Sequence, residues 1–99
     1  MAWNIEYDSR VLKEMKKLDR KTQQEILDYF DERIAPSQNP RNYGKELKSL
    51  FSGLWRYRIG DYRAICNIED ENLTVLVVRV GHRNKVYEKR FKKDLSAGV

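Results

Sequence analysis

The sequence has very little of the chemistry on which many enzymes depend. Its 99 residues include one cysteine, Cys66, and one histidine, His82. A single cysteine excludes an internal disulfide and a zinc site built from cysteines, and a single histidine excludes a metal site built from several imidazoles. The chain also lacks a glycine-rich phosphate loop, a Ser-His-Asp set and a paired-carboxylate signature. We therefore expect neither a metal ion nor a cofactor.

Long hydrophobic runs are absent as well. No apolar stretch approaches the roughly 20 residues that cross a bilayer, and residues 1–4 do not form a signal-peptide pattern. The length fits a single domain over residues 1–99. We expect a cytoplasmic protein with no membrane partner.

Acidic residues are in the minority, and the excess of positive charge is unevenly placed. The formal net charge is +5 and the sequence pI is about 9.4. Residues 1–40 hold seven basic and eight acidic side chains, whereas residues 41–99 hold 13 basic and seven acidic ones. A basic field in the second part attracts polyanions such as nucleic acid, an anionic membrane or an acidic protein. A solvated surface that keeps the protein soluble is the simpler alternative.

Two amphipathic helices are predicted in the first third of the chain. Asp8 and Ser9 are candidate N-caps of the first helix. The second helix begins at the capping box that starts with Thr22, or one turn earlier at Asp19, and Pro36 ends it. Each helix has one apolar stripe, which predicts an antiparallel helical hairpin. The apolar residues at helical spacing are Val11, Leu12, Met15, Leu18, Ile26, Leu27, Phe30 and Ile34.

Four segments have the pattern of strands. Residues 3–8 alternate between apolar and polar side chains, and residues 73–80 are rich in valine. Residues 54–59 and 62–68 are separated by Gly60-Asp61, which is typical of a two-residue type II′ hairpin. Residues 36–53 read as a long loop, and residues 86–95 as a short basic helix. The predicted fold is α+β, in the order βααβββ(α), with the helical hairpin packed on a mostly antiparallel four-stranded sheet.

The hairpin register divides the side chains of these two strands between two faces. With Gly60-Asp61 as the turn, Arg58 lies opposite Arg63, and Arg56 lies opposite Ile65. Like charges directly opposite each other destabilise a sheet, so the three arginines favour a functional role. A rigid arginine cluster suits a phosphate group, because the guanidinium fork binds two oxygens at once. The opposite face is predicted to be the core face and carries Trp55, Tyr57, Ile59, Tyr62, Ala64, Cys66 and Ile68.

A second cluster of polar groups, residues 81–87, follows the last predicted strand. His82, Arg83, Lys85 and Tyr87 bring an imidazole, two cations and a phenol close together. Taken alone, this segment also fits an ordinary polar connection. Arg79 belongs to the same group of candidates, but its face depends on a register that the sequence does not fix.

These residues resemble the RelE toxins of the RelE/ParE superfamily. The resemblance rests on Gly53-Leu54-Trp55-Arg56-Tyr57-Arg58-Ile59-Gly60-Asp61-Tyr62-Arg63, Val80-Gly81-His82-Arg83, Val86-Tyr87 and Lys45-Glu46-Leu47-Lys48. It covers nearly the whole chain, including the βααβββ order. It implies a toxin of a type II toxin–antitoxin pair, an endoribonuclease that cuts mRNA in the ribosomal A site through attack of the ribose 2′-OH on the adjacent phosphate.

The resemblance also implies partners and roles for particular residues. The partners would be a cognate RelB-like antitoxin, mRNA and the ribosome, with operator DNA contacted only through the antitoxin. His82, Lys85 and Arg79 are candidate substrate-binding residues on their own chemistry and position, and the resemblance assigns them no role. The candidate catalytic residues are Arg56, Arg58, Arg63, Arg83 and Tyr87, and of these we expect Arg63 and Arg83 to be exposed.

The sequence departs from the best-known members at one functional pair. Those members have lysines where this chain has Arg56 and Arg58. Arginine stabilises negative charge but does not serve as a general base, so that role falls to Tyr87, to His82 or to positioning alone. Two alternatives stay open, namely a ParE-like inhibitor of DNA gyrase with the same fold and a non-catalytic module that binds RNA or the ribosome.

Overall fold

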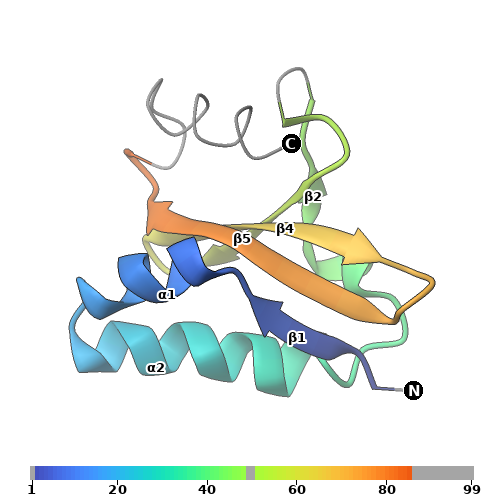
Figure 1. Ribbon diagram of the computed structural model, residues 1–99, viewed down its shortest axis with the longest axis horizontal. Helices are drawn as coiled ribbons and strands as arrows, with labels where there is room; N and C mark the ends of the chain where they lie inside the picture. The colour runs from blue at the N-terminus through green and yellow to red at the C-terminus, as the bar shows by residue number, and fades with distance from the viewer. Residues whose placement is uncertain (1, 49–50, 86–99) are drawn as a thin grey trace.

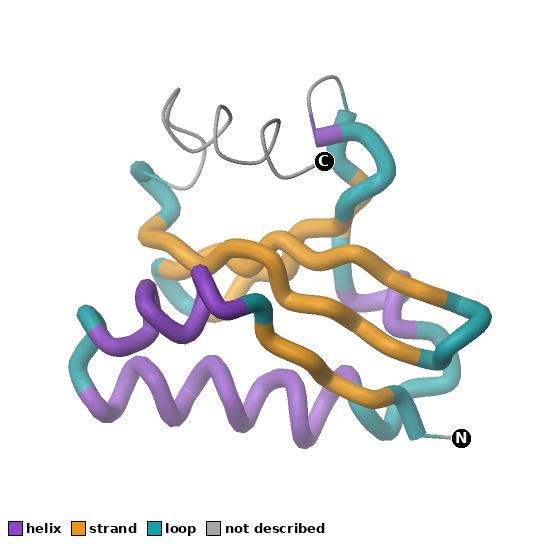
Figure 2. The backbone as a smooth tube through the Cα atoms, in the orientation of Figure 1, coloured by secondary structure: helices purple, strands orange, loops and turns teal. Residues whose placement is uncertain are grey.

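The computed structural model describes residues 2–48 and 51–85, in which two helices pack against one face of a five-stranded sheet (Figures 1 and 2). The strands lie in the order β1-β5-β4-β3-β2. Their bounds are β1 Asn4–Tyr7, β2 Lys45–Glu46, β3 Trp55–Ile59, β4 Tyr62–Glu69 and β5 Thr74–His82. The predicted helix over residues 86–95 and the candidate Tyr87 lie outside the described residues.

The predicted fold class is confirmed, with one added element. β1 runs parallel to β5, and every other pair of neighbouring strands is antiparallel. The fifth strand is β2, a two-residue edge strand inside the segment predicted as a loop. Its two residues, Lys45 and Glu46, have no apolar alternation, so periodicity gave no sign of a strand there.

Both helices begin at an aspartate. α1 spans Ser9–Lys16, and the side chain of Asp8 accepts a hydrogen bond of 2.9 Å from the backbone N–H of Arg10, as an N-cap does. α2 spans Arg20–Tyr29 with Asp19 as its N-cap, so the earlier of the two predicted starts holds. The helix then widens into a π-helical turn over Phe30–Ile34, just before Pro36. None of the helices among residues 2–48 and 51–85 combines the length and the apolar character needed to cross a membrane.

The main core lies between the helices and the predicted core face of the sheet. Tyr57, Ala64 and Cys66 are fully buried there against Val11, Ile26 and other helix residues. Burial raises the pKa of the Cys66 thiol well above its usual range, so this cysteine is a buried apolar group and not a nucleophile.

The segment before β2 is fixed to the sheet through Tyr57. The Tyr57 hydroxyl donates a hydrogen bond of 2.8 Å to the carbonyl of Pro40. Gly44 lies so close to this ring that a Cβ atom there would be 3.0 Å from it and 3.2 Å from the Arg56 carbonyl. Arg41, from the same segment, forms a two-bond ion pair with Asp70 in the β4–β5 turn, with distances of 2.9 and 2.7 Å.

The second face of the sheet, called the outer face below, is the one that carries Arg56. It also holds a small apolar cluster, in which Phe51 and Ile65 are buried against Leu47, Leu54 and Val78. The sequence predicted only the arginines on this face. The cluster forms because the connection from β2 to β3 folds back over Ile65.

Candidate functional site

The strand register places the sequence-predicted cations in two adjacent rows on the outer face. Arg58 lies opposite Arg63, and Arg63 lies opposite Gly81. In the next row Arg56 lies between Lys45 and Ile65, and Ile65 lies opposite Arg79. Directly opposed residues share a face, and neighbouring strands are about 4.8 Å apart. The predicted hairpin register is therefore confirmed, and it extends the basic surface over four strands.

A bulge in β5 decides the face of Arg79. Ile65 pairs with Arg79 whereas Cys66 pairs with Val77, so Val78 is an extra residue in the ladder. An extra residue lets two successive side chains point to one face. Val78 packs into the outer cluster, and Arg79 follows it on the same face. This is the register that the sequence left undetermined.

Arg63 differs from its predicted exposure. The residue is only 9% exposed, and its Nη1 atom donates to the carbonyls of Gly60 and Tyr62, at 2.9 Å each. The guanidinium group therefore folds back over its own hairpin turn. The expectation that Arg63 is exposed was wrong because the carbonyls of a tight turn are acceptors within reach of a neighbouring arginine.

The hairpin turn is also tied to the end of β5. Gly60 has a φ of +60°, which matches the first central position of the predicted type II′ turn. The backbone N–H of Arg83 donates to the carbonyl of Asp61 at 2.8 Å. This bond brings the exposed residue Arg83 next to the turn that Arg58 and Arg63 flank.

His82 lies apart from the arginine rows. It is the partner of Tyr62 in the ladder, and the two rings meet edge to face with centroids 5.6 Å apart. Tyr62 belongs to the core-facing set, so His82 sits at the end of that face. The Nδ1 atom of His82 accepts from the backbone N–H of Asn84 at 3.2 Å. This bond occupies Nδ1 as an acceptor and leaves Nε2 as the ring nitrogen that faces away from it.

The remaining cations differ in how firmly they are held. Arg58 and Lys85 are exposed. Arg56 is half-buried, and its Nε–H is fully covered without an acceptor among residues 2–48 and 51–85. Arg79 contacts Glu14 of α1, with 3.3 Å between Nη2 and Oε2. Sequence reasoning missed Glu14, because a single glutamate on a helix with several lysines gives no signal.

The chemistry of this surface is that of fixed positive charge. A buried donor without an acceptor, such as Nε of Arg56, costs free energy unless an acceptor arrives from elsewhere. Planar guanidinium groups match the oxygens of a phosphate. In the described parts of the chain, no three metal-ligating side chains come together. Arg56, Arg58, Arg63 and Arg83 form the candidate site, with Arg79 and Lys85 at its border.

Comparison with known proteins identifies the family. The family model for the ParE toxin of the type II toxin–antitoxin system parDE matches residues 5–87. The toxin RelG of Mycobacterium tuberculosis is 38% identical over 53 residues, which are 54% of this chain and 61% of RelG. The chain therefore spans about three-fifths of the length of that curated relative.

Solved structures agree on the fold. A chain of the RelBE2 toxin–antitoxin complex of Mycobacterium tuberculosis superposes with a TM-score of 0.77 at 24% identity, covering 84% of this chain and 93% of that one. A free E. coli RelE toxin variant gives a TM-score of 0.74 at 21% identity, covering 100% and 99%. The chain belongs to the RelE/ParE superfamily of type II toxin–antitoxin toxins.

Proposed function

We propose that the protein is a ribosome-dependent endoribonuclease that cuts mRNA in the ribosomal A site and so stops translation. The observation that carries this proposal is the pair of arginine rows at the hairpin turn, with Arg83 tied to the same turn. The resemblance to RelE toxins supports it, since cleavage of mRNA in the A site is the activity that this resemblance implies.

The reaction needs the charge that this surface supplies. The 2′-oxygen attacks the adjacent phosphorus and loses its proton, while the bond to the 5′-oxygen breaks and that oxygen gains a proton. The products are a 2′,3′-cyclic phosphate and a 5′-hydroxyl end. Negative charge builds up on the phosphate oxygens in the transition state, and preorganised cations stabilise it. The exposed Arg83 and Arg58 are proposed to contact the scissile phosphate, and the largely covered Arg63 adds positive charge behind them.

The proposed reaction also needs a general base that removes the proton from the 2′-OH. His82 lies on the other face and its Nδ1 accepts from Asn84, so it suits contact with the substrate better than removal of the proton. Arginine does not lose its proton at neutral pH. Tyr87 or positioning alone is left for this role, and Tyr87 lies outside the described residues.

A RelB-like antitoxin is the proposed protein partner. Several of the similar structures are complexes of RelE-type toxins with RelB-type antitoxins, from Mycobacterium tuberculosis, E. coli and Methanococcus jannaschii. An antitoxin that covers the basic outer face would need acidic or apolar groups facing the arginines and the Phe51 cluster. Contact with operator DNA would then be made through the antitoxin.

The test is cleavage of a defined mRNA by the purified protein, with and without ribosomes stalled at a known codon. We expect cuts within the A-site codon only when ribosomes are present. Arg83→Ala removes an exposed cation and should lower the rate about 100-fold or more. Arg20→Ala, on the helical layer, is the matched control and should cut normally. Normal cleavage by folded Arg83→Ala would contradict the site.

A second candidate function is inhibition of DNA gyrase. The observation that favours it is the family model, which describes ParE toxins. Supercoiling by gyrase in the presence of the protein separates the two proposals. Lost supercoiling together with intact mRNA on stalled ribosomes would replace the nuclease with the gyrase inhibitor. A module that only binds RNA or the ribosome would leave both the mRNA and supercoiling intact.

A further inference from the structure

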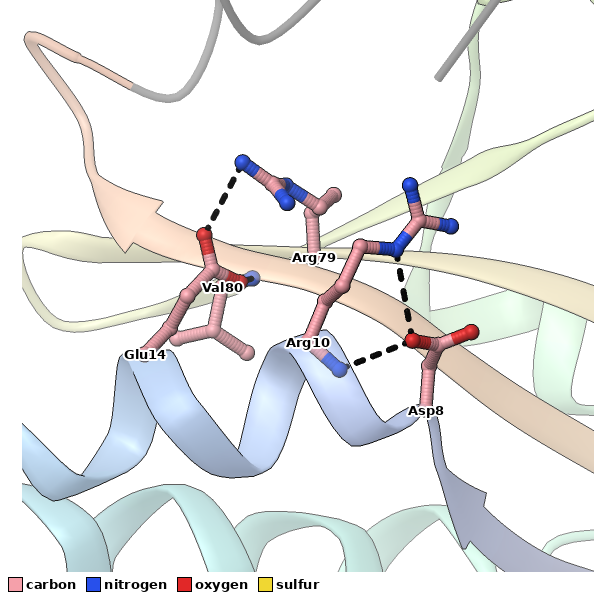
Figure 3. Close-up of polar contacts among 5 residues, drawn as sticks. All are labelled: Asp8, Arg10, Glu14, Arg79 and Val80. Atoms are coloured by element: carbon pink, nitrogen blue, oxygen red, sulfur yellow. Dashed lines mark hydrogen bonds and ion pairs between the residues drawn. The ribbon is translucent and has the colours of Figure 1, made fainter. Parts of the chain in front are cut away.

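Glu14 joins helix α1 to the basic face through two different contacts (Figure 3). Its Oε1 atom accepts a hydrogen bond of 3.0 Å from the backbone N–H of Val80. Its Oε2 atom lies 3.3 Å from Nη2 of Arg79. One carboxylate therefore binds the backbone of one β5 residue and the side chain of the residue before it.

The fold explains why a side chain occupies this place. β1 pairs with β5 only as far as Tyr7 opposite Val77, and the N–H of Asp8 then donates to the carbonyl of Val77 at 2.9 Å. Beyond this point α1 replaces β1 along the edge of β5. Backbone groups on a strand edge need partners, and Glu14 supplies the acceptor for Val80.

Stability alone does not account for the carboxylate. The side chains of Arg79 and Glu14 are 12% and 23% exposed, and covering an ion pair costs hydration free energy that the attraction often fails to return. Burial raises the pKa of Glu14 even though Arg79, Arg10 and Lys17 lie near enough to lower it. A raised carboxyl pKa means that the ionised group disfavours folding at neutral pH.

We propose that Glu14 is a positioning residue, whose carboxylate fixes the Arg79 guanidinium on the outer face, in the row that holds Arg56 on the far side of Ile65. This inference rests on the proposed function, in which the outer face meets mRNA, and it adds that Arg79, at the border of the site, contacts a phosphate of the bound strand. A fixed cation loses less side-chain entropy when it meets a phosphate than a mobile one does. The neighbouring Arg10 has a carboxylate of its own, since its Nε lies 3.3 Å from Oδ1 of Asp8.

Figure 3 shows Arg10 and Arg79 rising on the same side of β5, each beside its own carboxylate. Two like charges on one side of a strand repel each other, and this repulsion favours rotamers that move the two guanidinium groups apart. The carboxylate of Glu14 opposes this repulsion at Arg79. Its negative charge, and not only its hydrogen bond to Val80, is thus the feature that the proposal requires.

Glu14→Gln separates the two contacts. The amide oxygen of glutamine still accepts from Val80, but its NH₂ group presents a donor to Arg79 and the negative charge is gone. We expect an unchanged or higher Tm. We also expect mRNA cleavage to slow about tenfold or more, because a misplaced binding group lowers the rate by at least that factor. A purely structural residue would lower Tm and activity together, and that result would overturn the proposal.

The position of Arg79 is measured directly in the free protein. The Nε–H signal of Arg79, assigned by its loss in Arg79→Lys, reports by NMR how freely the side chain moves. We expect greater motion in Glu14→Gln than in the native protein. Unchanged motion would refute the positioning role, whether or not the protein cuts mRNA. Greater motion in a protein that never cuts mRNA would uphold the positioning and reject the proposed function.

Two further variants sharpen the result. In an Arg79→Ala background, Glu14→Gln should slow cleavage no further, because Glu14 acts through Arg79. An additional loss there would contradict the proposal. Glu25→Gln removes an exposed carboxylate from α2 and serves as the matched control, with native cleavage and native Arg79 motion expected.

Discussion

Two arginines of the outer face, Arg58 and Arg63, have different structural roles. Arg58 is exposed, whereas Arg63, directly opposite, donates two hydrogen bonds to the carbonyls of its own turn. The arginine that packs on the turn contributes to both structure and charge. The exposed one contributes charge without supporting the fold.

This difference gives a contrast between two alanine variants. Arg63→Ala removes donors from two turn carbonyls and should lower the free energy of unfolding by about 1–2 kcal/mol. Arg58→Ala should leave it within about 0.5 kcal/mol, as is usual for exposed sites. Urea unfolding of both variants measures this difference. Equal stabilities would show that the bonds to Gly60 and Tyr62 contribute nothing in solution.

Substitutions at two glycines test a close packing contact and a backbone conformation separately. Gly44→Ala places a methyl group 3.0 Å from the buried Tyr57 ring and 3.2 Å from a backbone carbonyl, at an ordinary φ of −119°. We expect a loss of about 1–3 kcal/mol from overpacking. Gly60→Ala meets no atom within 4 Å but must hold a φ of +60°, which costs about 1 kcal/mol. Thermal unfolding compares the two, and a neutral Gly44→Ala would contradict the close approach.

At the scale of elements, the start of α1 links stability to pH. The backbone N–H of Arg10, followed by its side chain, holds the pKa of the Asp8 carboxyl below its usual range. A lowered pKa means that this stabilisation is complete above the usual aspartate range and is lost as the pH falls through the folded-state pKa.

Two variants of Asp8 test this link. Asp8→Asn keeps a capping oxygen, so it should fold nearly normally at neutral pH while losing part of the acid sensitivity of Tm between neutral pH and the acidic range. Asp8→Ala should lose about 1 kcal/mol even at neutral pH. Tm measured against pH for the three proteins decides, and identical acid slopes in the native protein and Asp8→Asn would rule out the role of Asp8.

The elements also show how far the sequence alone could lead. The β3–β4 register was predictable because Gly60-Asp61 fixes it, and the core face followed from the alternation around Tyr57 and Ala64. The face of Arg79 was not, because a bulge within a run of valines leaves no periodic trace. The inward fold of Arg63 and the contact of Glu14 with β5 depend on tertiary approach, which local patterns do not encode.

At the scale of the whole molecule, the first and second parts of the chain differ in net charge. The helical first part is near neutral, and the excess of positive charge belongs to residues 41–99, which include four of the five strands. An RNA or ribosome that binds the outer face would release counterions from its phosphates. Association should therefore weaken steeply as salt concentration rises.

The slope of log affinity against log salt concentration depends on how many cations of the protein contact phosphates. Arg58→Ala should reduce the slope of log affinity against log salt concentration by about 1, because one phosphate contact is lost. Lys21→Ala, at the start of α2, should leave the slope unchanged. Filter binding of ribosomes over a salt series supplies the measurement. Equal slopes for Arg58→Ala and the native protein would remove Arg58 from the phosphate-binding surface.

The position of β5 between β1 and β4 has a consequence for the order of events during synthesis. The two helices and the β3–β4 hairpin all leave the ribosome before residues 74–82, yet β1 has no strand partner until those residues arrive. Because chains are made from the N-terminus at roughly 5–20 residues per second, the nascent protein passes through a stage with helices and a hairpin but no joined sheet. Arg79 reaches Glu14, and Arg83 reaches the hairpin turn, only after that stage. The basic face is thus completed late, because the hairpin already carries Arg56, Arg58 and Arg63 but an unfinished chain lacks Arg79 and Arg83 in their final places.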